Sequence, residues 1–404
     1  MSERENKNVA RHCPICSNPF GDVLHRQEFY LESSHPLPAA YDVIACRQCG
    51  FVYADTAASQ EQYDRFYRDY SKYETVALAT GGGATGLDAQ RLEETAADIA
   101  LQISDKNAAI LDIGCANGGL LAVLQRKGYR NLTGLDPAPA CVAYVAQQGI
   151  RAYLGGLFSD STADEASDEQ RYDCIILSHV LEHVCDLQKA VRNLLARLKE
   201  HGVIYVEVPD SSRYHDYYIV PYYYFDCEHI NHFDEHSLNN LFTLHGCSYL
   251  HHRKKEIVVA GNKRYPAVYA MFRNTGKMIG SQGMVFHDTV ITSVQHHIHQ
   301  SVSNAPNTIF DALQKEQEPL VIWGAGSHAL RLMKNTPLGK CNVRAFVDKD
   351  LKKQGTYIGM IQVHDPGYLV GFVGTVVVCS ALHGQEIADE IRHMGITNPI
   401  VMTN

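Results

Sequence analysis

Residues 110–118 read Ile-Leu-Asp-Ile-Gly-Cys-Ala-Asn-Gly, an apolar run that ends in a glycine-rich turn. The run predicts a buried strand, and the apolar spacing of residues 120–127 predicts a helix directly after it. Small residues at Gly114, Ala116 and Gly118 would let the backbone approach a ligand closely. A strand, a tight turn and a helix in this order favour an α/β fold built on a parallel sheet.

The same alternation continues on the C-terminal side of this unit. The expected strands cover residues 132–135, 174–178 and 203–208, and the expected helices cover residues 141–148 and 187–199. Strands that alternate with helices imply a parallel sheet covered by helices. Two further runs, residues 256–260 and 267–273, flank Gly261 and Pro266. They predict an antiparallel pair that closes this sheet.

A second alternation starts at residues 320–323, which read Leu-Val-Ile-Trp. A glycine turn, a helix, strands over residues 343–347 and 375–379 and a last helix follow, so we expect a second, smaller α/β domain. Before it, apolar residues recur every fourth position, which predicts a connecting helix with one apolar stripe. The stripe consists of Val290, Val294, Ile298 and Val302.

The length supports several domains, because 404 residues correspond to roughly two to four. We divide the chain into a block with paired cysteines at residues 9–75, the first α/β unit at 76–275, a helical linker at 276–319 and the second α/β unit at 320–404.

The composition excludes several classes of protein. A net charge of −9 disfavours non-specific nucleic-acid binding, and 45% apolar residues disfavour long disorder. No apolar run approaches the roughly 18 residues that a membrane span needs. The polar residues 1–13 lack the apolar stretch of a secretory signal, so we expect a cytoplasmic protein with no membrane partner.

Two C-x-x-C pairs, Cys13-Pro-Ile-Cys16 and Cys46-Arg-Gln-Cys49, are separated by 29 residues. Two such pairs can supply four thiolates to one tetrahedral zinc, and four protein ligands leave no open position for catalysis. We therefore predict a structural zinc site. Four ordinary buried cysteines are the alternative, and a redox pair is less favoured because neither pair opens an evident helix. Residues 1–75 carry a net charge of −3, which argues against a nucleic-acid ribbon.

Asp136 ends the strand that follows the glycine-rich turn, 24 residues after Asp112. A carboxylate at this place can hydrogen-bond both hydroxyls of a ribose. The turn has the spacing G-x-A-x-G, whereas a dinucleotide site usually shows G-x-G-x-x-G. The pattern therefore indicates a nucleoside-containing ligand other than a dinucleotide.

Residues 222–233 read Tyr-Tyr-Tyr-Phe-Asp-Cys-Glu-His-Ile-Asn-His-Phe and follow the strand over 203–208, at the expected binding edge of the sheet. Glu228 beside His229 can orient the imidazole and raise its basicity. The alternative is that His229 and His232 anchor a loop or cap a helix. His179 and His183 fall on an expected helical segment, where one would line the cofactor pocket and the other would pack.

Four segments, DIGCANG, GLDP, YDCIILSHVLEHV and GVIYVEVPD, resemble the successive motifs of class I S-adenosylmethionine-dependent methyltransferases. The resemblance covers about residues 85–275. It implies that Asp112, Gly114 and Gly118 surround the methionine part of the cofactor, with Ala116 where many members have glycine. It further implies that Asp136 holds the ribose, and that Leu157 and Ser178 lie near the adenine and the methionine.

The whole layout resembles the zinc-containing sugar C-methyltransferases, which act on nucleotide-linked keto-deoxysugars. The resemblance implies that Glu228 and His229 form a catalytic pair with His229 as the base, and that Tyr73 or Tyr70 enters the pocket. The family commonly has a tyrosine two residues before the glutamate, where this sequence has Asp226, with Tyr224 nearby. O-methylation or a different carrier therefore stays open. We expect Asp226 and His232 to contact the substrate.

The C-terminal segment Trp323-Gly-Ala-Gly-Ser-His-Ala329, with Asp348 after the next strand, is similar to a dinucleotide fingerprint that ends in alanine. A helix N-terminus suits a diphosphate equally well. The sugar-methyltransferase resemblance implies that this Rossmann-like domain contributes to nucleotide-sugar binding. The expected contacts are Gly324, Gly326, Ser327, His328 and Asp348.

These patterns together predict a three-domain enzyme that methylates a nucleotide-linked sugar, with carbon as the favoured acceptor, S-adenosylmethionine as cofactor and a structural zinc. The alternatives are an O-methyltransferase, a nicotinamide-dependent oxidoreductase built on the C-terminal domain, and a non-catalytic nucleotide-sugar sensor. No nucleic-acid partner is expected, and the sequence leaves the oligomeric state open.

Overall fold

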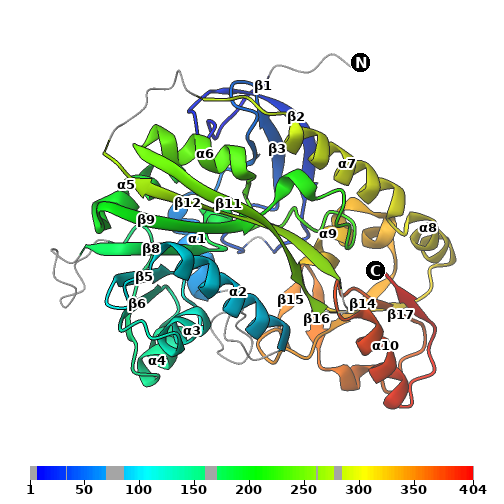
Figure 1. Cartoon of the computed structure of the whole chain (residues 1–404). Helices are drawn as coiled ribbons and strands as arrows, with labels where there is room; N and C mark the ends of the chain where they lie inside the picture. The colour runs from blue at the N-terminus through cyan, green and yellow to red at the C-terminus, as the bar shows by residue number, and fades with distance from the viewer. Residues whose placement is uncertain are drawn as a thin grey trace.

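A computed structural model describes residues 7–32, 34–69, 86–159, 171–260, 263–276 and 284–403. Three sheets organise this part of the chain, and the long helix α7 (Thr289–Asn304) runs along the outside between the first and the third (Figure 1). No helix within these ranges is both long and apolar enough to cross a bilayer.

The N-terminal sheet is antiparallel, with the order β1-β2-β3-β4-β10. Its strands are β1 (Lys7–Asn8), β2 (Phe20–Glu28), β3 (Ala40–Cys46), β4 (Val52–Asp55) and β10 (Asn231–His232). The last strand comes from the histidine-rich segment and pairs with β4, so that Asn231 lies opposite Tyr53. The helix α1 (Gln60–Asp69) follows β4.

The middle sheet has seven strands in the order β11-β12-β9-β8-β5-β6-β7. The strands are β5 (Ala109–Ile113), β6 (Asn131–Asp136), β7 (Arg151–Leu154), β8 (Tyr172–Ser178), β9 (Leu198–Pro209), β11 (Cys247–Val258) and β12 (Arg264–Asn274). The helices are α2 (Gly86–Gln102), α3 (Gly119–Arg126), α4 (Pro139–Gln147), α5 (Leu187–Arg197) and α6 (Glu235–Leu244). The predicted parallel strands and the antiparallel closing pair are confirmed; β7 was not predicted.

The C-terminal sheet has the order β15-β16-β14-β13-β17-β18, and only the pairing of β15 is antiparallel. The strands are β13 (Leu320–Trp323), β14 (Val343–Val347), β15 (Tyr357–Ile358), β16 (Ile361–His364), β17 (Thr375–Val378) and β18 (Ile400–Met402). The helices α8 (Asn307–Glu316), α9 (Ser327–Asn335) and α10 (Gly384–His393) accompany them. The strand, turn, helix and strand expected from residue 320 onward are therefore present.

The cysteine block does not have a core of its own. Cys13, Cys49 and Phe51 belong to the same buried apolar cluster as Leu177 and Val206 of the middle sheet. The block thus covers one face of that sheet, and the position of each depends on the other.

The helix α7 differs from its predicted apolar stripe. Val290 and Val294 are buried, but Val302 is 55% exposed. The buried face of α7 continues instead through polar side chains, among them His297 and Ser301. Ser301 can be buried because its hydroxyl donates to the backbone carbonyl of His297, one turn earlier. A search for apolar residues alone cannot find such a face.

The buried guanidinium of Arg11 connects the first two sheets. It donates five hydrogen bonds of 2.8–3.2 Å to oxygens of Ala54, Val184, Cys185, Ile230 and Asn231. The backbone N–H of Arg11 also donates to Asp55 at 2.7 Å. One side chain therefore fixes the loop after β8 and the segment that leads into β10.

His297 generates a prediction about acid stability. Burial lowers its pKa to about 3 from an ordinary value near 6.5. Below pH 6.5 the unfolded chain binds a proton that the native state does not bind, so the free energy of unfolding must fall as the pH falls towards 3. Replacing His297 by leucine should remove about 1.4 kcal/mol per pH unit from this slope.

The measurement is urea unfolding of the wild type and of His297→Leu between pH 6.5 and pH 4. The exposed His299 on the same helix supplies the matched control, and His299→Leu should keep the wild-type slope. If the free energy of unfolding has the same pH dependence in His297→Leu and in the wild type, His297 takes up a proton in the native state as well, which contradicts the prediction.

Candidate active site

A cavity of about 1510 Å³ lies between the carboxyl ends of the middle-sheet strands, the helix α1 and the turn between β13 and α9. Most of the predicted site residues line it. These are Asp112, Gly114, Ala116, Asp136, Leu157, Ser178, Tyr224, Asp226, Glu228, His229, Gly324, Gly326, Ser327, His328 and Asp348. The structure thus brings the predicted cofactor and substrate residues to one space. Tyr70 and Tyr73 lie outside the described residues.

Two predicted contact residues are not on the cavity wall. Gly118 has a φ of +69°, and a Cβ at this position would lie 2.7 Å from Cγ2 of Val145. Its small size therefore serves the packing of α3 on α4, and its predicted cofactor contact stays a prediction. His232 is fully buried in β10, where its Nδ1 shares a 3.3 Å hydrogen bond with the Tyr214 hydroxyl. The predicted substrate contact of His232 is wrong for this reason.

The cofactor turn, residues 114–118, is held by the acid at the end of β6. Oδ2 of Asp136 accepts the N–H of Ala116 at 2.8 Å, and its Oδ1 accepts the N–H of Ala138 at 2.9 Å. The turn also needs a glycine at position 114, because φ is +75° there and a Cβ would lie 2.7 Å from a Val180 methyl carbon. The carboxylate keeps further lone pairs for a ligand hydroxyl.

Asp112 is a buried acid beside this turn. Burial, and to a lesser extent the charge of Asp136, raise the pKa of Asp112 to about 8. A cation placed next to Asp112 would restore its ionised form. S-adenosylmethionine fits these donors and acceptors, because its amino-acid ammonium is a cation and its ribose hydroxyls can donate to Asp136.

His179 follows β8 with a φ of +56° and is part of a loop, not of the predicted helix. Its Nδ1 lies 3.3 Å from Glu182, and its Nε2 lies 3.4 Å from Glu207. Burial alone would lower the pKa of His179, but the two carboxylates raise it to about 9. His179 is therefore an imidazolium at neutral pH. His183, in a short 3₁₀ turn (Leu181–His183), lines the cavity as well, so both histidines face it.

Glu207 is buried at the carboxyl end of β9 and was not predicted as a site residue. It accepts hydrogen bonds from Nζ of Lys255 at 2.7 Å and from the Tyr205 hydroxyl at 2.6 Å. Burial would raise the pKa of Glu207, but Lys255 holds it well below its usual range. Because Lys255 also pairs with Asp98 of α2 at 2.9 Å, a buried network ties this helix to the cavity wall.

The catalytic segment, residues 226–229, carries the predicted pair. The Tyr67 hydroxyl of α1 donates to Oε2 of Glu228 at 2.8 Å. The rings of His183 and His229 lie 4.8 Å apart. Burial, and secondarily His183, lower the pKa of His229 well below its ordinary value, so His229 is neutral and can accept a proton. Among the described residues, Tyr67 therefore supplies a phenol hydroxyl to the predicted pair.

Tyr224 does not fit the catalytic role predicted for it. Its hydroxyl donates to the backbone carbonyl of Tyr217 at 2.6 Å, and its ring stacks on that of Tyr214 at 3.8 Å. Burial raises the pKa of Tyr224 well above its usual value. The hydroxyl is thus committed to the backbone, and only the remainder of the side chain is left for the cavity wall.

Asp226 is held by groups from both flanking sheets. Its carboxylate lies 3.3 Å from Nη1 of Arg331, a buried residue of α9, and its backbone carbonyl accepts the Tyr41 hydroxyl at 2.8 Å. Burial would raise the pKa of Asp226, but Arg331 lowers it. Asp226 therefore forms an ion pair between the segment 226–229 and the helix α9.

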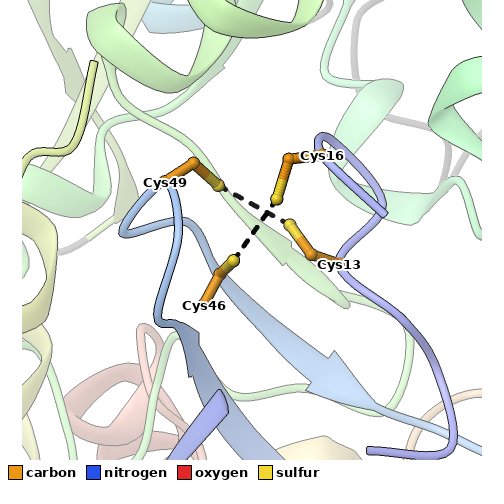
Figure 2. A group of neighbouring side chains, drawn as sticks. All are labelled: Cys13, Cys16, Cys46 and Cys49. Atoms are coloured by element: carbon orange, nitrogen blue, oxygen red, sulfur yellow. Dashed lines mark hydrogen bonds between the residues drawn. The ribbon is translucent and has the colours of Figure 1, made fainter. Parts of the chain in front are cut away.

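The four predicted zinc ligands converge as Figure 2 shows. Sγ of Cys13 lies 3.6 Å from that of Cys49, Sγ of Cys16 lies 3.5 Å from that of Cys46, and all four lie within 4.8 Å of one another. Sulfurs at about 2.3 Å from a tetrahedral zinc would be about 3.8 Å apart. The cluster could therefore hold zinc with little rearrangement.

Residues 88–252 match the family model described as "Methyltransferase domain". Curated relatives include ubiquinone biosynthesis O-methyltransferases of Rickettsia prowazekii, 30% identical over 26% of this chain and 41% of the relative, and of Bradyrhizobium diazoefficiens, 30% identical over 24% and 38%. The chain thus spans about two fifths of the length of these relatives. Residues 88–252 are therefore similar to a methyltransferase domain.

Solved structures with a similar arrangement include two methyltransferases. One is the 1,6-didemethyltoxoflavin-N1-methyltransferase of Burkholderia thailandensis, with a TM-score of 0.40, 15% identity, and coverage of 62% of this chain and 99% of that one. The other is an S-adenosylmethionine-dependent methyltransferase of Methanosarcina mazei, with a TM-score of 0.37, 17% identity, and coverage of 44% and 98%.

The zinc ligands generate a test of the cluster. Zinc analysis of the purified chain should find one ion per molecule, and Cys46→Ser should lose it and lower the melting temperature, because metal binding contributes directly to folding. Cys341→Ser, which changes a cysteine outside the cluster, should keep both the metal and the melting temperature. A metal-free wild type, or full zinc retention in Cys46→Ser, would contradict the assignment.

Asp136 generates a test of the cofactor turn. Removing its carboxylate leaves ribose hydroxyls unpaired at a cost of about 1–3 kcal/mol. Asp136→Ala should therefore weaken S-adenosylmethionine binding roughly 5- to 150-fold in calorimetry. Asp105→Ala, at an exposed acid outside the cavity, is the control and should bind normally. Unchanged affinity in Asp136→Ala would show that the ribose lies elsewhere.

Proposed function

We propose that the chain transfers the methyl group of S-adenosylmethionine to a nucleotide-linked sugar, at the carbon beside a keto group. The observation that carries this proposal is the single cavity shared by the cofactor turn, the catalytic segment and the turn between β13 and α9. A proton acceptor and two parallel-sheet edges suited to nucleotide-like ligands face the same space. An acceptor with a nucleotide at one end and a sugar at the other fits that arrangement.

His229 is the base in this proposal. Its imidazole is neutral because burial and His183 keep its pKa low, so one ring nitrogen can take the proton from the carbon next to the keto group. The electron pair of that C–H bond becomes the enolate, which then attacks the methyl group. When bound, S-adenosylmethionine would supply this methyl group as an electrophile, with its sulfur–methyl bond breaking to leave S-adenosylhomocysteine.

Other groups on the cavity wall would stabilise the negative charge that develops on the enolate oxygen. Tyr223 and Tyr265 line the cavity, and burial raises the pKa of both phenols, so each remains a hydrogen-bond donor for an enolate oxygen. Glu228, one residue before the base in the sequence, has its carboxylate fixed by the Tyr67 hydroxyl. The proposed zinc lies with its four cysteines outside this chemistry and would have a structural role.

The direct experiment incubates the full chain with S-adenosylmethionine and a panel of nucleotide-linked sugars, with and without keto groups, and looks for the mass of one added methyl. Methylation of a keto sugar at carbon would support the proposal. Methylation of a sugar that lacks a keto group would replace it by O-methylation, the reaction named for the ubiquinone-pathway relatives. Nucleotide-sugar binding with no turnover would favour a sensor.

His229→Gln generates the mechanistic prediction. The variant keeps hydrogen-bonding capacity but lacks the proton acceptor, so turnover should fall about 10²–10⁴-fold. Cofactor affinity should stay unchanged, because the cofactor turn lies on other strands. His299→Gln, at an exposed histidine, is the control and should retain full activity.

Hydrogen exchange separates the two steps of the reaction. In heavy water without the methyl donor, the wild type should exchange a hydrogen next to the keto group, and His229→Gln should not. If methylation is lost while exchange persists, another group is the base. Near-normal turnover in the variant would mean that His229 has only a structural role.

A further inference from the structure

Glu182 is a buried acid on the cavity wall to which the reaction proposed above gives no role. It is 2% exposed and lies in the 3₁₀ turn Leu181–His183 that follows β8. Its Oε2 is buried and has no hydrogen-bond partner within the described part of the chain. A buried carboxylate oxygen without a donor is unfavourable, so its place on the wall of a ligand cavity indicates a donor that arrives with the ligand.

The charge of Glu182 is already balanced by a cation. One of its oxygens, Oε1, lies 3.3 Å from Nδ1 of His179, which is an imidazolium at neutral pH. The other carboxylate beside His179, that of Glu207, has a cation of its own in Nζ of Lys255, at 2.7 Å. Because each acid has its own cation, neither a metal ion nor the ammonium of S-adenosylmethionine is needed there. The partner that Glu182 lacks is therefore a neutral donor, and the neutral donor that a sugar offers is a hydroxyl.

Two hydrogen bonds attach the loop around Glu182 to the segment that carries the proposed base. The backbone carbonyl of Glu182 accepts the N–H of Ile230, the residue after His229, at 2.9 Å. Nδ1 of His183 lies 3.0 Å from the backbone carbonyl of Glu228, and since a carbonyl only accepts, this ring nitrogen donates. The rings of His183 and His229 are 4.8 Å apart. Glu182 thus belongs to the part of the cavity wall where the reacting carbon would lie.

Tyr265 lies near the same carboxylate. Its ring centroid is 6.3 Å from that of His179, the ion-pair partner of Glu182. Burial raises the pKa of the Tyr265 phenol, and the charges of Tyr214 and Glu182 raise it further. The carboxylate therefore shares its surroundings with the base and with one of the phenols proposed to donate to the enolate oxygen.

From this placement we infer that Glu182 is a specificity-determining residue, which binds a hydroxyl group of the acceptor sugar on or directly beside the reacting carbon. The hydroxyl donates to the carboxylate. Rotation about the terminal bond of a glutamate side chain is soft, so the carboxylate can turn an oxygen to this donor. The inference rests on the proposed function and narrows the acceptor to keto sugars that keep this hydroxyl, as opposed to sugars that are deoxygenated there.

The test compares sugars that differ by one hydroxyl. The probes are nucleotide-linked 3-keto and 4-keto hexoses, on UDP, GDP, CDP and dTDP carriers, together with the counterparts that each lack one hydroxyl. A hydrogen bond to a charged acceptor is lost with the bound hydroxyl, so kcat/KM of the wild type should fall about 10- to 150-fold for the counterpart that lacks it. This comparison needs no variant.

Variants assign the preference to Glu182. Glu182→Ala should bring the ratio of kcat/KM between the two sugars close to one. Glu182→Gln keeps the shape of the side chain, and it should give an intermediate ratio because a neutral acceptor binds a hydroxyl more weakly than an ionised one. It also serves if Glu182→Ala fails to fold. The control is Glu200→Gln, at an exposed acid off the cavity wall, which should keep the wild-type ratio.

The ratio separates a contact from a structural role, because a glutamate that only supports the fold would affect both sugars equally. An unchanged ratio in both Glu182 variants, or equal use of every deoxy counterpart by the wild type, would overturn the inference while methylation of a nucleotide-linked keto sugar stands. A rate that rises with added Mg²⁺ would assign the free oxygen to a metal ion and overturn the hydroxyl contact. If no nucleotide-linked keto sugar is methylated, both this inference and the proposed function are wrong.

Discussion

The buried guanidinium of Arg11 is the interaction on which the geometry of the cavity depends. Its two terminal nitrogens, Nη1 and Nη2, donate to carbonyl and amide oxygens from three separate stretches of chain, and no carboxylate is among these acceptors. One stretch carries His183 to the cavity, and another follows directly after His229. Because Cys13 is only two residues from Arg11, the cysteine cluster fixes the backbone from which the guanidinium extends. The cysteine cluster, which lies outside the cavity, thereby helps to set the spacing of His183 and His229.

The same cavity wall holds two histidines in opposite charge states. His179 lies between two buried carboxylates and is cationic, whereas His229 faces a second imidazole in a desolvated place and is neutral. Lysine and tyrosine donors behind Glu207 keep that acid ionised, and the acid in turn keeps His179 protonated. The two histidines differ in charge because their neighbours differ: carboxylates surround His179, whereas His183 lies beside His229. A fixed cation and a proton acceptor thus arise from one residue type.

Patterns local in sequence predicted most of the middle sheet. Residues 110–113 and 174–178 are mostly apolar, and Asp136 is marked by its place at the end of a similar run. The edge strand β7 has no such signal, because its two inner residues are only half-buried and its two outer residues are exposed. Tyr67, Glu207 and Arg331 escaped prediction because their partners are distant in sequence, with Lys255 48 residues from Glu207 and Glu228 161 residues from Tyr67. His232 was misassigned because adjacency to Glu228 and His229 does not show which side of a strand faces the cavity.

The strand β10 delays the completion of the N-terminal sheet while the chain is being synthesised. It completes the N-terminal sheet by pairing with β4, yet β4 ends at Asp55 and β10 begins at Asn231. While the intervening residues are still being translated, the edge of β4 has no partner, and an open edge invites pairing with other chains. Such a distant contact also slows folding, because a long loop must close before the strands meet. A chain released from the ribosome before Asn231 would therefore carry an incomplete sheet with a permanently open edge, however well its cysteines were arranged.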